Sequence, residues 1–311
     1  MSPRRSAFID IGTNAILCLI AELRETGRFR VLDDLADIAR LGRGVDQNGR
    51  ISTDGEARAL AVLERYLEHC RSLGVEEIVA VGTSALREAV NSAAVRSRLR
   101  DILGIDIRVI SGDEEAAYSF LAVVRGLTLT ERELLVIDIG GGSTEFIRGN
   151  ASGVSESVSL NLGSVRLTER YLHCDPVRSD EVADMVGAMD RELTPLRDRL
   201  RDGAIPFTLV GIAGTFTTLA AVEKGLQSYA HARVHGSRLA LTEVRRQVRL
   251  FQNRSIEARK EIVGLEPKRA DVILAGACMI ERIMTLFDTD SIIVSDQGVR
   301  YGLLHERVQT L

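Results

Sequence analysis

The chain contains 311 residues, of which 45% are hydrophobic and 27% charged, and its formal net charge is −4. Two domains are expected, because domains usually contain roughly 150 residues. The charge argues against a general nucleic-acid coat. The four cysteines are far apart in the sequence, which argues against a disulfide framework or a zinc knuckle. No run of roughly 18 uncharged apolar residues is present, which argues against a membrane span. We therefore expect a soluble, cytoplasmic protein with neither nucleic-acid nor membrane partners.

The chain opens with an apolar strand that ends in an aspartate and a loop of small residues. Residues 7–14 read Ala-Phe-Ile-Asp-Ile-Gly-Thr-Asn, and the β-rich stretch from Ala15 predicts a hairpin. Residues 134–144 repeat the pattern as Leu-Leu-Val-Ile-Asp-Ile-Gly-Gly-Gly-Ser-Thr, again followed by a β-rich stretch, from Glu145. The second half of the chain therefore begins like the first.

Two further pairs of segments recur in the same order. A strand, a Gly-Thr turn and a helix from Ile78 match those from Leu209, and a strand followed by a helix start at Ile107 matches one at Ile292. A helical tract is expected over roughly 242–287. Two such halves imply an α/β protein of two mixed sheets flanked by helices, with the matched turns converging on a cleft between them. Coincidental likeness between common β-α units is the alternative.

Three successive glycines, Gly140, Gly141 and Gly142, follow the second of the aspartate strands. Without Cβ atoms the backbone can bring several amide N–H groups toward one anion, and Ser143 and Thr144 add hydroxyl donors. A tight hairpin turn needs only one or two glycines, so the loop favours phosphate binding. The chain has neither a P-loop motif nor a Gly-x-Gly-x-x-Gly that opens a helix, so another phosphate-binding fold is required.

Acidic residues and one arginine stand beside these turns. Asp10 and Asp138 end strands at the expected cleft, where they either share a divalent cation or cap their own turns. Glu114 and Glu115 suit the first turn of a helix, yet one of them could orient an attacking water. Arg87 is expected near the first turn of a helix, where a cation is unfavourable, so a phosphate partner or an ion pair with Glu88 or another acid would explain it.

Two further patterns have plainer interpretations. His231 and His235 stand four residues apart, but the glycines around them indicate a loop and no third zinc ligand is evident. The basic residues over 245–269 alternate with glutamates, which is typical of a solvated helical surface, although some could follow a polyanion.

Taken together, these loops give the sequence a specific resemblance to a known family. From about Phe8 to Leu304 it resembles the exopolyphosphatase and guanosine pentaphosphate phosphohydrolase (Ppx/GppA) family. The motifs that carry this resemblance are Arg40-Leu-Gly-Arg-Gly, Gly82-Thr-Ser-Ala-Leu-Arg, Ile110-Ser-Gly-Asp-Glu-Glu-Ala, Val136-Ile-Asp-Ile-Gly-Gly-Gly-Ser-Thr-Glu and Ser295-Asp-Gln-Gly-Val-Arg.

The resemblance implies a role for each of these loops. Glu115 would activate the attacking water, and Asp138 and Glu145 would bind Mg²⁺ (or Mn²⁺), to which the pairing of the two strand-end aspartates adds Asp10. The implied phosphate contacts come from Thr13, Asn14, Arg87, Gly140, Gly141, Gly142, Ser143, Thr144, Gly214 and Thr215. Gly12-Thr-Asn-Ala replaces the common Gly-Ser-Asn-Ser, so one hydroxyl is missing at Ala15.

The fold implied is a pair of duplicated actin-like (ASKHA, ribonuclease H-like) domains with an interdomain cleft. We expect domain I over 1–124 together with a C-terminal helix of about 297–311, which packs back on domain I, and domain II over 125–296. Family members of similar length have only these two domains.

The resemblance implies an exopolyphosphatase that removes terminal phosphates by metal-assisted attack of water. Guanosine pentaphosphate or nucleoside di- and triphosphates are alternative substrates, although 4% aromatic residues and no tryptophan favour polyphosphate over a nucleotide. An actin-like kinase and a phosphate or alarmone sensor without turnover are two competing interpretations. A homodimer is possible, but a dimer face cannot be told from core by pattern.

Overall fold

The computed structural model describes residues 4–24, 28–127, 129, 133–201 and 207–309. The chain divides into two compact units: unit 1 comprises Met1–Arg125 and Gly298–Leu311, and unit 2 comprises Gly126–Gln297. Each unit is built on one mixed sheet with helices, which confirms the predicted α/β class with two mixed sheets. No helix in the described ranges combines the length and apolar character needed to cross a membrane.

The sheet of unit 1 has five strands in the order β3-β2-β1-β4-β5. The hairpin predicted at the start of the chain is confirmed, because β1 and β2 are antiparallel and Asp10 is paired with Leu17. A third antiparallel strand extends this hairpin, and two parallel strands lie on its other side. The strands are β1 (Arg4–Ile11), β2 (Ala15–Arg24), β3 (Arg28–Ile38), β4 (Glu77–Gly82) and β5 (Ile107–Val109).

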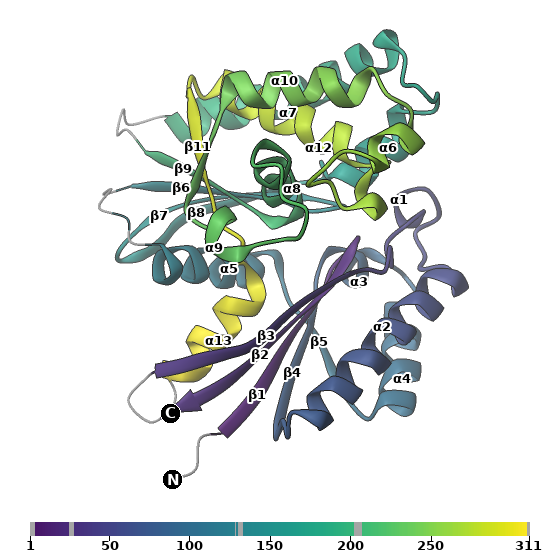
Figure 1. Ribbon diagram of the computed structural model, residues 1–311. Coiled ribbons are helices and arrows are strands. Elements are labelled where there is room, and N and C mark those ends of the chain that lie inside the picture. Colours follow the sequence, from purple (N-terminus) through teal and green to yellow (C-terminus); the bar gives the residue numbers. More distant parts are fainter. Residues whose placement is uncertain (1–3, 25–27, 128, 130–132, 202–206, 310–311) are drawn as a thin grey trace. The chain divides into compact units, whose positions relative to one another are not determined.

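Helices cover both faces of this sheet, as Figure 1 shows for α2 and α13. Strand β1 is accordingly apolar on both sides: Ile9 belongs to one core cluster and Phe8 to another. The second cluster also contains Leu304, so the last helix completes the core of unit 1. The helices of this unit are α1 (Val45–Asn48), α2 (Thr53–Ser72), α3 (Ser84–Glu88), α4 (Ser92–Leu103), α5 (Gly112–Gly126) and α13 (Val299–Gln309).

Unit 2 repeats the strand order of unit 1 and adds one strand. Its sheet runs β10-β11-β9-β6-β7-β8, with β6, β7 and β8 antiparallel and β6, β9 and β11 parallel. The additional strand, β10, is antiparallel to β11. The strands are β6 (Leu134–Ile139), β7 (Thr144–Asn150), β8 (Gly153–Leu160), β9 (Thr208–Ile212), β10 (Ser237–Ala240) and β11 (Ser291–Val294). The second predicted hairpin is thus confirmed.

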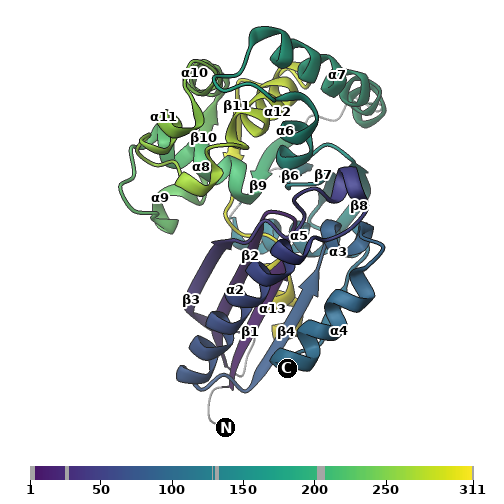
Figure 2. The same ribbon diagram turned by 90° about the vertical axis from the view of Figure 1, so that its right-hand side faces the viewer.

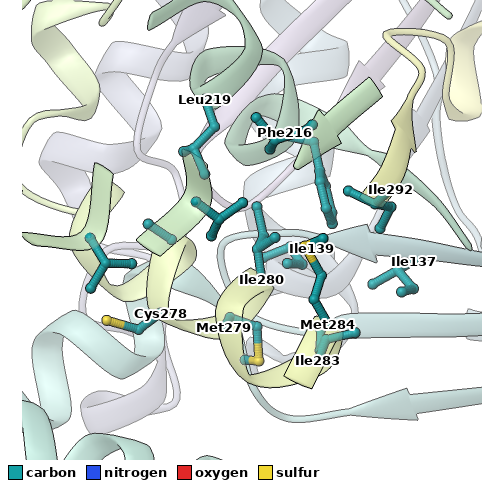
Figure 3. Packing of buried hydrophobic residues seen from close by; sticks show 14 of the residues in the cluster. Ile137, Ile139, Phe216, Leu219, Cys278, Met279, Ile280, Ile283, Met284 and Ile292 are labelled. Carbon is teal, nitrogen blue, oxygen red and sulfur yellow. The ribbon is translucent and has the colours of Figure 1, made fainter. Parts of the chain in front are cut away.

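The core of unit 2 is centred on α12 (Ile273–Leu286), which is buried among strands and helices. In Figure 3, Ile280 and Met284 of this helix lie near Ile139 of β6 and Phe216 of α8 (Ala213–Glu223). The expected tract 242–287 is divided into α10 (Leu241–Gln252), α11 (Ile256–Lys260), a 3₁₀ helix (Pro267–Arg269) and α12. Helices α10 and α12 pack together (Figure 2). The remaining helices are α6 (Ser164–Tyr171), α7 (Ser179–Arg201) and α9 (His231–Val234).

Candidate functional site

Asp10 lies at the carboxyl end of β1 and has a carboxylate oxygen in an unusual environment. Part of the residue is exposed, but Oδ1 is buried and has no hydrogen-bond partner among the described residues. Burial and then the charge of Glu115 raise the pKa of Asp10 to about 7, against an opposing effect of Arg300. A buried carboxylate oxygen without a donor is costly unless it takes up a proton or a cation. The geometry therefore suits a cation ligand.

Substituting Asp10 by asparagine is expected to stabilise the metal-free protein near neutral pH. Because the folded-state pKa is raised, the wild type binds a proton that the unfolded chain releases, so its stability falls as pH rises from about 4 to about 7. The variant should lack this loss, which amounts to at most roughly 4 kcal/mol at about 1.4 kcal/mol per pKa unit. Denaturant unfolding in EDTA between pH 4 and 8 measures it. The exposed Asp101→Asn is the control, and parallel curves for wild type and Asp10→Asn would contradict the prediction.

The loop after Asp10 holds Thr13 and Asn14 by their backbones. The Thr13 carbonyl accepts from the Gly42 amide at 2.9 Å, and the Asn14 carbonyl from the Arg40 amide at 2.8 Å. The Asn14 side-chain nitrogen Nδ2 is buried and has no partner among the described residues. This amide is therefore available to an anionic oxygen.

The structure separates the adjacent glutamates of α5. Glu114 forms a capping box: its backbone amide donates to Ser111 Oγ at 3.1 Å, and its carboxylate accepts from the Ser111 amide at 2.8 Å. Glu115 is buried, and its Oε2 accepts from an Arg87 guanidinium nitrogen at 2.8 Å. Burial raises the pKa of Glu115, against the lowering effect of Arg87. Glu114 therefore caps the helix, whereas Glu115 is a buried carboxylate held by Arg87.

Arg87 lies in the short helix α3, as expected, and forms an ion pair with an acid, Glu115. In this five-residue helix the fourth residue belongs to the last turn as well as being near the first, so helix electrostatics do not demand a phosphate. Glu88 accepts from Ser84 Oγ instead of pairing with Arg87. Arg87 donates to Glu115 and, at 3.1 Å, to the Ile110 carbonyl, and so ties α3 to the start of α5.

In unit 2, Asp138 of β6 and Glu145 of β7 are direct cross-strand partners. Like charges placed opposite one another destabilise a sheet unless something offsets them. Ser159 Oγ donates to Glu145 at 2.8 Å. Mg²⁺ usually takes only one or two carboxylates and completes its shell with water and phosphate oxygens, so this pair fits it. The unit 1 equivalent of Glu145 is Leu17, so the strand-end aspartate faces a second carboxylate in the second hairpin but not in the first.

The triple-glycine loop connects β6 to β7. Its carbonyl oxygens accept hydrogen bonds from the start of α6, whereas the amides of Gly141, Gly142 and Ser143 have no partner among the described residues. Thr144 is fully buried, and its hydroxyl donates to the Leu162 carbonyl at 2.5 Å. The loop therefore offers backbone amides, while the Thr144 side chain holds the loop in place.

The predicted Gly214-Thr215 turn leads from β9 into α8. Ala213 has a left-handed φ of 71°, and a Cβ on Gly214 would lie 2.2 Å from the Arg269 guanidinium. Thr215 is buried against Gly276. Burial lowers the pKa of Arg269. From the sequence, Arg269 belongs to the basic residues predicted to form a solvated surface. Its position over the Gly214-Thr215 turn was not predicted, because no spacing pattern links residues so far apart in the chain.

His231 and His235 share an acceptor, Asp296. Their Nδ1 atoms lie 2.5 and 3.1 Å from its carboxylate, and the two rings stack with centroids 5.1 Å apart. Burial acts to lower the pKa of His235, but bonds to Asp296 and the Gly126 carbonyl outweigh it and raise the pKa above 6.5. Within the described residues, no group of three or more His, Cys, Asp or Glu side chains is arranged to hold a metal ion.

Two repeated mixed sheets, with carboxylates and amide-rich loops at their strand ends, define an α/β protein suited to binding phosphate groups. The family model described as "Ppx/GppA phosphatase family" matches residues 19–311. The chain therefore belongs to the Ppx/GppA phosphatase family, and the resemblance inferred from its motifs is confirmed.

The chain is similar in sequence to relatives of about its own length and to longer ones. "Exopolyphosphatase 2" of Mycobacterium tuberculosis is 35% identical over 291 residues, covering 91% of each chain. A "Bifunctional 3-dehydroquinate synthase/phosphatase" of Fusobacterium nucleatum is 34% identical over 97% of this chain, which spans 46% of that protein. A "Guanosine-5'-triphosphate,3'-diphosphate pyrophosphatase" of Vibrio atlanticus is 30% identical over 99% of this chain and 60% of its own length.

Solved structures agree in fold along almost the entire chain. An exopolyphosphatase from Cytophaga hutchinsonii superposes with a TM-score of 0.90 at 30% identity, covering 99% of both chains. The Aquifex aeolicus Ppx/GppA family member gives a TM-score of 0.81 at 33% identity, covering 99% of this chain and 98% of its own.

Proposed function

We propose that the protein is an exopolyphosphatase that hydrolyses the terminal phosphoanhydride bond of inorganic polyphosphate. The observation that carries this proposal is Glu115, a buried carboxylate bonded to Arg87 at the start of α5. Hydrolysis needs a base that orients water and accepts its proton. A relative named as an exopolyphosphatase matches 91% of this chain, which supports the same chemistry.

Each loop has a defined part in this reaction. Glu115 accepts the proton of the attacking water, and Arg87 fixes the Glu115 carboxylate and contacts a phosphate oxygen. The amides of the triple-glycine loop and the Gly214-Thr215 turn in unit 2 bind phosphate oxygens and offset their charge, and the Asn14 side chain of unit 1 is a further phosphate donor. Asp138 and Glu145 of unit 2 would hold Mg²⁺ or Mn²⁺, which when bound withdraws charge from the phosphate oxygens. Asp10 of unit 1 is a further candidate cation ligand.

Guanosine pentaphosphate is the second candidate substrate. The observation that favours it is Tyr229, an aromatic residue that is 55% exposed and whose hydroxyl donates to Asp296. An exposed ring of this kind could stack on a base. Phosphate release from long-chain polyphosphate and from guanosine pentaphosphate, each with Mg²⁺, tests the two substrates. No release from either by folded protein would overturn the proposal and favour a kinase or a sensor.

Chelation is expected to abolish phosphate release, and added Mg²⁺ or Mn²⁺ should restore it. Asp138→Asn should raise the Mg²⁺ concentration needed for half-maximal rate by about 10–100-fold, because it removes one of two adjacent carboxylates. Titrating Mg²⁺ into the apo-enzyme measures this shift. Asp184→Asn, an exposed change on α7, is the control. Full activity of Asp138→Asn at the wild-type Mg²⁺ requirement would remove Asp138 from the metal site.

A further inference from the structure

The first turn of α6 bonds all three carbonyl groups of the triple-glycine loop. The Gly140 oxygen accepts from the Ser164 amide at 3.0 Å and from its hydroxyl at 3.3 Å. The Gly141 oxygen accepts from the amides of Val165 and Arg166 at 2.9 and 3.1 Å. The Gly142 oxygen accepts from Arg166 Nε at 2.7 Å. Three successive carbonyls are therefore directed to one helix end.

The geometry of the peptide group determines where the amide N–H groups of this loop point. In a planar trans peptide, the C=O and the following N–H point in opposite directions. Because the three carbonyls face α6, the N–H groups of Gly141, Gly142 and Ser143 point away from it. A hydrogen bond to a carbonyl also polarises its own peptide, which makes the N–H a stronger donor.

Arg166 supplies the charged bond in this set. Its side chain is buried in unit 2, and Nε donates to the Gly142 carbonyl oxygen. A cation therefore polarises the peptide group that joins Gly142 to Ser143 and carries the Ser143 amide. Gly163 allows the close approach: a Cβ there would lie 2.3 Å from the Gly141 oxygen and 2.6 Å from the Gly142 carbonyl carbon. The backbone of the loop therefore packs directly against the backbone at the start of α6.

We propose that Arg166 and Gly163 are positioning residues that hold the Gly141, Gly142 and Ser143 amides in a donor set for one phosphate group. This inference rests on the proposed function, since it assigns the donors for that phosphate. Arg166 acts through the loop and does not touch the substrate. The sequence carries no signal for it, because Arg166 lies 24 residues beyond Gly142.

The test uses Arg166→Gln and Arg166→Lys, with Arg170→Gln as the matched control on the exposed end of α6. Arg166→Gln is expected to lower kcat for polyphosphate by about 10²-fold, similar to removal of one oxyanion donor, with a smaller change in KM. Arg166→Lys should recover part of this loss because it keeps the charge. Wild-type kcat and KM in folded Arg166→Gln would overturn the proposal.

A binding measurement separates this inference from the proposed activity. In ¹H–¹⁵N spectra, adding inorganic phosphate to the wild type should shift the Gly141, Gly142 and Ser143 amides, and Arg166→Gln should weaken the response at least several-fold. Gly163→Ala should weaken it too. Amides that do not respond in the wild type would overturn the positioning role. A phosphate response without any hydrolysis would instead overturn the proposed function and leave the donor set standing.

Discussion

Glu115→Gln is expected to lower the rate of phosphate release by about 10²–10⁴-fold, the usual contribution of a positioned general base. Glutamine keeps the shape of the side chain and can still meet Arg87, but it cannot accept a proton from water. Substrate affinity should change little. Single-turnover release of phosphate, together with equilibrium binding of polyphosphate, measures the two effects separately.

The neighbouring glutamate offers a matched control. Glu114→Gln keeps a capping box with Ser111, because glutamine can also accept from the Ser111 amide. It removes only the exposed ion pair with Arg108, so it should cost at most about 1 kcal/mol of stability and leave the rate near that of the wild type. Equal losses of activity in the two variants would mean that the start of α5 matters only structurally. Substantial hydrolysis by Glu115→Gln would show that another group activates the water.

Gly302→Ala is expected to destabilise unit 1 by roughly 2–3 kcal/mol. A Cβ at this position of α13 would lie 2.2 Å from the Tyr118 carbonyl oxygen and 2.6 Å from its carbonyl carbon, both backbone atoms of α5. The helices would have to separate, and overpacking of this kind usually costs about 1–3 kcal/mol. The gain of roughly 1 kcal/mol in helix propensity from alanine is too small to offset a backbone clash.

Gly187→Ala separates the clash from the effect of alanine itself. Gly187 also lies within a helix, but its nearest neighbour to a new Cβ is the end of the Arg191 side chain, at 3.8 Å. This variant should be as stable as the wild type or slightly more so. Denaturant unfolding of both variants is the measurement. A Gly302→Ala protein as stable as Gly187→Ala would show that α13 can shift away from α5 without cost.

The local pattern of apolar residues predicted the strands that lead into the candidate phosphate-binding loops. Both aspartate hairpins, the parallel strands after them and their order in the repeat are present. The outer strands β3 and β8 were not predicted. Strand β3 carries charged residues along an edge of the sheet, and β8 is mostly serine, valine and glutamate with exposed positions. Edge strands lack the apolar character that marks buried ones.

The candidate site could be predicted where residues are neighbours in sequence and not where the fold joins distant ones. The aspartates lie at the carboxyl ends of β1 and β6, and the glycine loop follows β6 directly, so their location could be predicted from the sequence. The Arg87–Glu115 bond spans 28 residues, and the bond from Arg166 to Gly142 spans 24. Spacing rules describe one element at a time, so the partners of these two arginines emerge only from the packed structure.

The last helix has a consequence for how the protein is made. Strand β1 opens unit 1, yet the face that carries Phe8 and Leu19 is covered by Tyr301 and Leu304 of α13, which are synthesised after all of unit 2. Domains generally fold as they emerge, with the N-terminal one first. Here the order is reversed: unit 2 can finish folding on the ribosome, while unit 1 keeps an apolar sheet face open until α13 has emerged.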